Sequence, residues 1–178
     1  MHIILGVLGA VITILILLNR LAEAGIDLGG LNPFLWQRRR RWQKQLQGNP
    51  IYQIQSPLDL TALLATATAK SDGDMSSTEK KALLDLFQKE FGMSKKNSAE
   101  LLLASAYLLG TGEELRNNLS KVMQTSLENF TQDQSESAIS LLEEICSVDP
   151  DGNDLKVQFV SNVKAIFSKH FEPKGKWE

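Results

Sequence analysis

The sequence has few of the residues from which catalytic centres are usually built. Its 178 residues include one cysteine and two histidines, and the histidines, His2 and His170, stand near the two chain ends. A single cysteine excludes an internal disulfide. Cys146, in the apolar stretch "LLEEICSV", is predicted to be a small buried hydrophobic residue rather than a nucleophile. No phosphate-binding loop, nucleophile elbow or histidine-rich metal motif occurs. We therefore expect a protein that is not an enzyme.

The sequence also lacks an even distribution of charge. Residues 1–55 hold six basic and two acidic side chains, and the remainder holds 13 basic and 19 acidic ones. A basic front on an acidic body indicates that the front contacts something anionic. The acidic body would repel phosphates, so no nucleic-acid partner is expected.

A long uncharged run occupies residues 1–18, "MHIILGVLGAVITILILL", where only His2 can carry a side-chain charge. At 1.5 Å per residue, about 18–20 such residues nearly cross a hydrocarbon layer of about 30 Å, so we predict a transmembrane anchor over residues 1–22. The alternatives are a buried core helix and a cleaved signal peptide, because the Ala-Glu-Ala at residues 22–24 resembles a cleavage site. The length of the run and the lack of basic residues before it favour the anchor.

Residues 23–55 are predicted to form a juxtamembrane linker with a short basic helix on the cytoplasmic leaflet. Tryptophan favours the headgroup zone, and each arginine adds about 1 kcal/mol of attraction to anionic lipid. The arginine bias places the N-terminus outside and the body in the cytoplasm. The alternative is a flank that sets this topology without lipid specificity. The candidate membrane-contacting residues are Trp36, Arg38, Arg39, Arg40, Arg41 and Trp42.

The body, residues 56–172, reads as helix throughout, with a short tail at 173–178. Ser56 precedes a proline suited to the first helical position, Ser94 is a cap, and capping boxes begin at Ser76, Thr111 and Thr131. Short connections predict a compact all-α bundle of about six helices in two pseudo-repeats. The expected helices lie near 57–70, 77–91, 95–109, 112–129, 132–148 and 153–171. Their apolar stripes include Leu83, Leu84, Leu86, Phe87 and Phe91 in the second helix, and Val157, Phe159, Val160, Val163, Ile166 and Phe167 in the last.

Two Asp-Gly loops, at residues 72–73 and 151–152, fall at corresponding places in the two pseudo-repeats. Neither has the ligand spacing of an EF-hand loop, although Asp72 and Glu79 would stand at suitable positions in the first. If the repeat brings the loops together, their acids form one cluster that attracts a hard divalent cation (Ca²⁺, Mg²⁺ or Mn²⁺). The alternative is purely structural: Gly73 ends one helix in the left-handed conformation, and Ser76 caps the next. The candidate metal-binding residues are Asp72, Asp74, Glu79, Asp149, Asp151 and Asp154.

The stretch "AKSDGDMSSTEKKALLDLF" resembles the signature helix-loop-helix of TerB-like domains, named for tellurite-resistance proteins and also found in the membrane-anchored DjlA co-chaperones. The resemblance covers roughly residues 56–170, and the second Asp-Gly loop supports it. It implies a fold of two helical repeats with an acidic, metal-binding surface that includes Asp72, Asp74 and Glu79. The segment "GLNPFLWQRRRRW" is similar to that of small bacterial membrane proteins with one such domain, which implies a single-pass protein of the bacterial inner membrane.

Two functions remain open at this point. The first is a membrane-tethered cytoplasmic module that binds an unidentified protein partner, tuned by a divalent cation, in an envelope or metal-stress response. The second is a structural, assembly or co-chaperone-like factor that acts on anionic membrane without metal. No His-Pro-Asp triplet occurs, so the chain lacks a J-domain with which to stimulate a DnaK-type chaperone.

Overall fold

The computed structural model describes Thr13, Ile16 and residues 49–71, 73–148 and 153–172. The predicted anchor, apart from Thr13 and Ile16, and the predicted basic helix lie outside these residues. No helix within the described ranges is long and apolar enough to span a bilayer.

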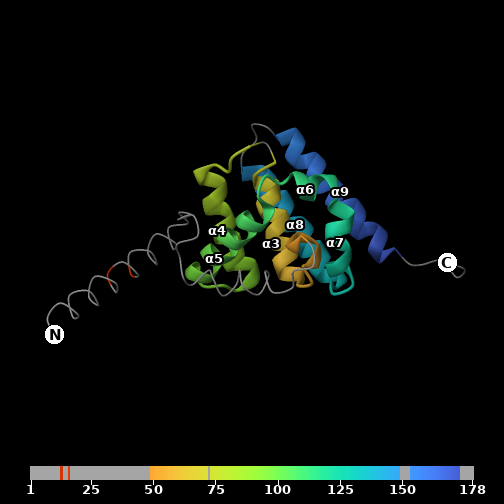
Figure 1. Ribbon diagram of the computed structural model, residues 1–178, viewed down its shortest axis with the longest axis horizontal. Coiled ribbons are helices and arrows are strands. Elements are labelled where there is room, and N and C mark those ends of the chain that lie inside the picture. Colours follow the sequence, from red (N-terminus) through yellow and green to blue (C-terminus); the bar gives the residue numbers. More distant parts are fainter. Residues whose placement is uncertain (1–12, 14–15, 17–48, 72, 149–152, 173–178) are drawn as a thin grey trace, which may run out of the picture.

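The described residues form helices and no strands, which confirms the all-α bundle (Figure 1). In chain order the elements are η1 (Pro50–Gln53), α3 (Pro57–Ala69), α4 (Ser77–Phe91), α5 (Lys95–Leu109), α6 (Glu113–Asn117), α7 (Leu119–Leu127), α8 (Gln132–Val148) and α9 (Asn153–Phe171).

Side-chain caps set most of the helix starts, as predicted. The hydroxyls of Ser56, Ser76 and Ser94 each accept a hydrogen bond from a backbone amide three residues on. The capping boxes at Ser76 and Thr131 are reciprocal, since the acid or amide three residues later also binds the backbone N–H of the capping residue. These bonds satisfy amides that the helix itself leaves without a partner.

The single helix expected over residues 112–129 is wrong, because the chain breaks at Asn118 into α6 and α7. Asn118 has φ −129° and ψ 30°, outside the helical region, and its side-chain amide donates to the Glu114 carbonyl that also accepts its backbone amide. The capping box expected at Thr111 is also absent: Gly112, at φ +77°, is the N-cap and makes no side-chain cap bond. The Glu114 carboxylate that was to complete the box accepts the hydroxyl of Tyr52 instead.

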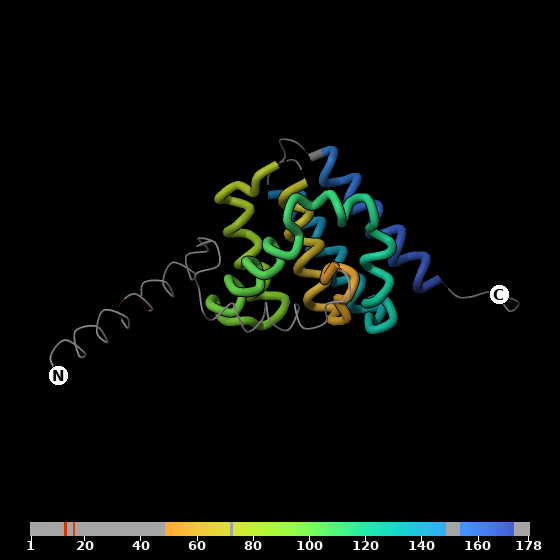
Figure 2. Tube along the Cα trace, in the orientation of Figure 1, coloured from red at the N-terminus to blue at the C-terminus, as the bar shows by residue number. Residues whose placement is uncertain are grey.

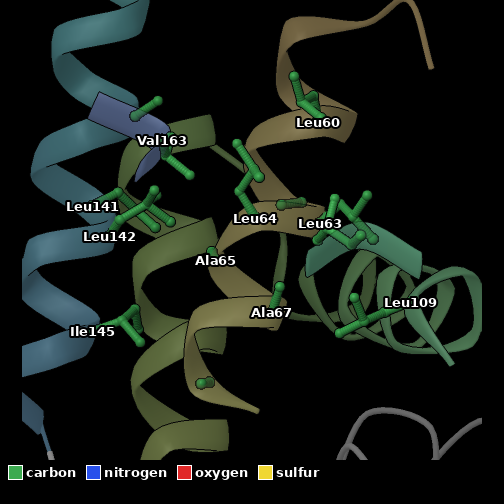
Figure 3. Close-up of a cluster of buried hydrophobic side chains, with 14 of the residues drawn as sticks. Leu60, Leu63, Leu64, Ala65, Ala67, Leu109, Leu141, Leu142, Ile145 and Val163 are labelled. Carbon is green, nitrogen blue, oxygen red and sulfur yellow. The ribbon is translucent and has the colours of Figure 1, made fainter. Parts of the chain in front are cut away.

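Helix α3 lies at the centre of the core. Ten consecutive residues, from Leu60 to Ala69, are buried, and the helix contacts α4, α5, α7, α8 and α9. Figure 3 shows its leucines and alanines facing side chains of α5, α8 and α9. The buried hydroxyls of Thr66 and Thr68 donate to carbonyls one turn earlier in the same helix, so they enter the core with their hydrogen bonds satisfied.

The segment that leads into α3, residues 49–55, is held against α7. Thr125 donates to the carbonyl of Tyr52 at 2.9 Å, Ser126 donates to that of Ile54, and Asn129 donates to that of Gln55 at 2.9 Å. Donating to Glu114 raises the pKa of the Tyr52 hydroxyl, since ionisation would end that hydrogen bond. These contacts fix where the chain enters the bundle and therefore where α3 begins.

Candidate functional site

The first turn of α4 carries a buried carboxylate with two fixed partners. One oxygen of Glu79, Oε2, accepts the backbone N–H of Ser76 at 2.8 Å in the capping box. The other, Oε1, accepts the ammonium of Lys156, in the first turns of α9, at 2.7 Å. The side chains of Lys156 and Glu79 are 0% and 2% exposed. Two opposite charges this deeply buried are stable only because they neutralise each other.

This ion pair joins the beginnings of α4 and α9, which lie at the same end of the bundle (Figure 2). In the sequence, the two Asp-Gly pairs precede these two helices. Sequence reasoning missed Lys156. Its signal was its spacing from Val160, Val163 and Phe167, because positions 156, 160, 163 and 167 share one helix face.

Because Lys156 is buried, the side of α9 that faces the core differs from the side predicted from the sequence. Val157, predicted to lie in the core, is 51% exposed, and its neighbour Leu155 is 55% exposed, so that part of the stripe prediction is wrong. The rest of the stripe packs inward, with Phe159, Val160, Val163 and Phe167 buried and Ile166 partly buried. Lys156, Val160, Val163 and Phe167 share the buried face, and Val157, one residue and about 100° further around the helix than Lys156, lies off that face.

Three of the six predicted metal-binding residues are described by the structure, and they differ in surroundings. Glu79 has both oxygens engaged, whereas Asp74 and Asp154 are exposed. Asp72, Asp149 and Asp151 lie outside the described residues. Among those that are described, no group of three or more acidic, histidine or cysteine side chains is placed to hold a metal ion. The cation site therefore stays a prediction.

The structural alternative for the first loop holds only in part. Ser76 caps α4, as expected. Helix α3, however, ends at Ala69, and its C-cap is Lys70 at φ −103°, so Gly73 does not supply a left-handed stop. Gly73 has φ +146°, which still favours glycine, but it lies in the turn between the helices.

Cys146 is buried, which confirms the prediction for the only cysteine. Burial raises the pKa of its thiol; the nearby positive charge of Lys156 opposes that shift, and Glu143 adds to it. A thiol held neutral in an apolar site is a poor nucleophile at neutral pH.

An apolar groove lies at the meeting point of α3, α4 and α8, and its volume is about 340 Å³. Phe130 and Leu141 are buried in its floor, and Leu58 and Phe91 are partly exposed beside them. The lining residues are Pro57, Leu58, Thr61, Glu90, Phe91, Phe130, Asp133, Gln134, Ser137, Ala138 and Leu141. Because three separate segments meet here, no local sequence motif marks this groove.

The surroundings of the groove are acidic. Glu90 and Asp133 line it, and both are exposed. An adjoining depression of about 320 Å³ shares Glu90, Ser137 and Leu141 with the groove and adds Lys89, Glu136, Ser140 and Glu144. Lys89 pairs with Glu90 at 3.0 Å, and its pKa is raised, first by that hydrogen bond and then by the charges of Glu90 and Glu144. Two of these carboxylates, Glu90 and Glu144, thus act on Lys89.

No protein-family model, curated protein or solved structure gave a significant match to this chain. The resemblance to TerB-like domains therefore stays a prediction, as do the cellular location and stress response that it implies.

Proposed function

We propose that the chain is a non-enzymatic, membrane-tethered module that binds a partner protein through the groove between α3, α4 and α8. The observation that carries this proposal is the groove itself. It combines an apolar floor with partly exposed aromatic and aliphatic side chains and a few polar groups at its edge, the composition expected of a binding site.

The other parts of the proposal come from the sequence. The uncharged run over residues 1–18 tethers the bundle to a membrane, and the arginines after it place the bundle in the cytoplasm. A tether raises the effective concentration of the groove for partners at the same membrane. The envelope or metal-stress context implied by the TerB-like resemblance belongs to this proposal as well.

A groove-filling substitution tests the proposal. Ser137 is exposed on α8 and lines the groove, so Ser137→Trp fills the groove without entering the core. The matched control is Ser161→Trp, at an exposed position on α9 away from the groove. Tagged full-length chain is recovered from membranes in neutral detergent, and co-purifying proteins are quantified. We expect a partner that the wild type and Ser161→Trp retain and that Ser137→Trp captures about tenfold less, equivalent to about 1.4 kcal/mol.

Two further arms of this experiment separate the alternatives. Capture that a chelator abolishes would support a cation-tuned module, in which the Asp-Gly loops take part. The assembly-factor alternative acts through anionic lipid. It would be supported if replacing Arg38–Arg41 by glutamine abolished capture while Ser137→Trp left capture unchanged. Equal capture by wild type and Ser137→Trp would contradict binding through the groove.

A further inference from the structure

We infer that the occupant of the groove is a basic amphipathic helix of a partner protein, and this inference rests on the proposed function. The groove is lined along α8 by Gln134, Ser137, Ala138 and Leu141, which follow one another at helical spacing on one face. Seven residues of helix span about 10 Å, so two turns of α8 form one wall. A wall of this kind suits a partner helix whose apolar side chains recur at positions i, i+3 or i+4, and i+7.

Charge complementarity determines the sign of the charge expected on that partner helix. The groove and its adjoining depression present Glu90, Asp133, Glu136 and Glu144, and among the described residues the only basic side chain lining either is Lys89. That lysine is already paired with Glu90, so it offers little attraction to an acidic ligand. Arginine or lysine beside an apolar anchor residue would meet two carboxylates that line the groove from different helices, Glu90 near the end of α4 and Asp133 at the start of α8.

The same charges argue against an anionic lipid surface as the occupant. A phosphate or carboxylate headgroup placed at this groove would face Glu90 and Asp133, with Glu136 and Glu144 in the adjoining depression. The apolar floor, formed in part by Phe91 and Leu58, therefore suits the hydrophobic side of a cationic helix better than a bilayer.

A peptide titration tests this assignment with the full-length chain in neutral detergent micelles. The probe is a fluorescent 16-residue helical peptide with leucine and phenylalanine on one face and arginine and lysine on the other. The control peptide replaces every basic residue with glutamate. We expect the basic peptide alone to bind, more weakly as salt is raised, and Ser137→Trp to abolish that binding while Ser161→Trp leaves it unchanged.

A second variant changes charge instead of shape. Replacing Glu90 by glutamine and Asp133 by asparagine keeps the groove open and removes the two carboxylates that line it. We expect about tenfold weaker binding of the basic peptide, since each exposed pair contributes up to about 1 kcal/mol. Binding that is unchanged in this variant, or equal binding of the acidic peptide, would overturn the charge argument.

The remaining outcomes separate this inference from the proposed function. No binding of the basic peptide, together with Ser137-dependent capture of a protein, would overturn the basic-helix assignment and leave the proposed function standing. No binding and no such capture would overturn both. Tighter peptide binding by the variant with Arg38–Arg41 replaced by glutamine would show that the chain's own basic segment fills the groove, and would overturn the assignment to a separate partner.

Discussion

Replacing Lys156 with methionine is expected to lower the free energy of unfolding by about 3–5 kcal/mol. The substitution leaves the Glu79 carboxylate buried without the ammonium that neutralises it, and methionine restores none of that charge. Glu79→Gln should lower the free energy of unfolding by a similar amount, because it leaves the Lys156 ammonium buried without a negative charge. Glutamine can still accept the capping hydrogen bond from the backbone N–H of Ser76. Chemical denaturation of the full-length chain, followed by circular dichroism in neutral detergent, measures both.

The double variant Glu79→Gln, Lys156→Met is the control for this prediction. Removing both charges removes the desolvation cost along with the attraction, so the double variant should recover most of the stability that either single change loses. If both single variants unfold like the wild type, the pair is hydrated in solution and does not hold α4 against α9.

Phe167→Ala is expected to cost about 3–5 kcal/mol of stability, the second large effect. Phe167 is buried in the last helix, and its ring lies 5.0 Å, centroid to centroid, from that of Phe130. Phe130 forms part of the groove floor, so the cavity left by the substitution lies directly behind the proposed binding surface. The measurement is the same denaturation curve, together with the affinity for the basic peptide, which should also fall.

Phe171→Ala, one turn later on the same helix, is the matched control. Its ring is only partly buried, so the transfer and cavity terms are smaller and the loss of stability should be clearly less. Equal losses for the two variants would mean that α9 is held near its C-terminus by something other than the Phe130–Phe167 contact.

The helix starts could be predicted from the sequence because capping is local chemistry. Ser76 and Glu79, or Thr131 and Gln134, satisfy each other's backbone amides within one turn, whatever surrounds them. The same pattern failed at Thr111, where Glu114 is drawn away to Tyr52, 62 residues earlier. A partner that distant is decided by tertiary packing, which a local motif does not contain.

The candidate sites show the same division. The sequence singled out Glu79 as a capping residue and as a cation ligand, because an acidic residue at the start of a helix gives no indication of which positive charge it will meet. The structure supplies one in Lys156, 77 residues later. The groove could not be foreseen at all, since Leu58, Phe91 and Phe130 come from separate segments and each reads as an ordinary core residue. The predicted lipid-contacting residues, and the Asp-Gly residues that lie outside residues 49–71, 73–148 and 153–172, stay predictions.

The most direct test of the account is a photo-crosslinking measurement in intact cells. A photoreactive amino acid replaces Ser137 in the groove or, in a parallel strain, exposed Thr78 at the start of α4 beside the ion-paired end of the bundle. Irradiation at Ser137 should give a covalent adduct with a protein that carries a basic amphipathic helix, and irradiation at Thr78 should give none. Adducts at Thr78 alone would contradict the account and would assign partner binding to the end of the bundle where α4 and α9 begin.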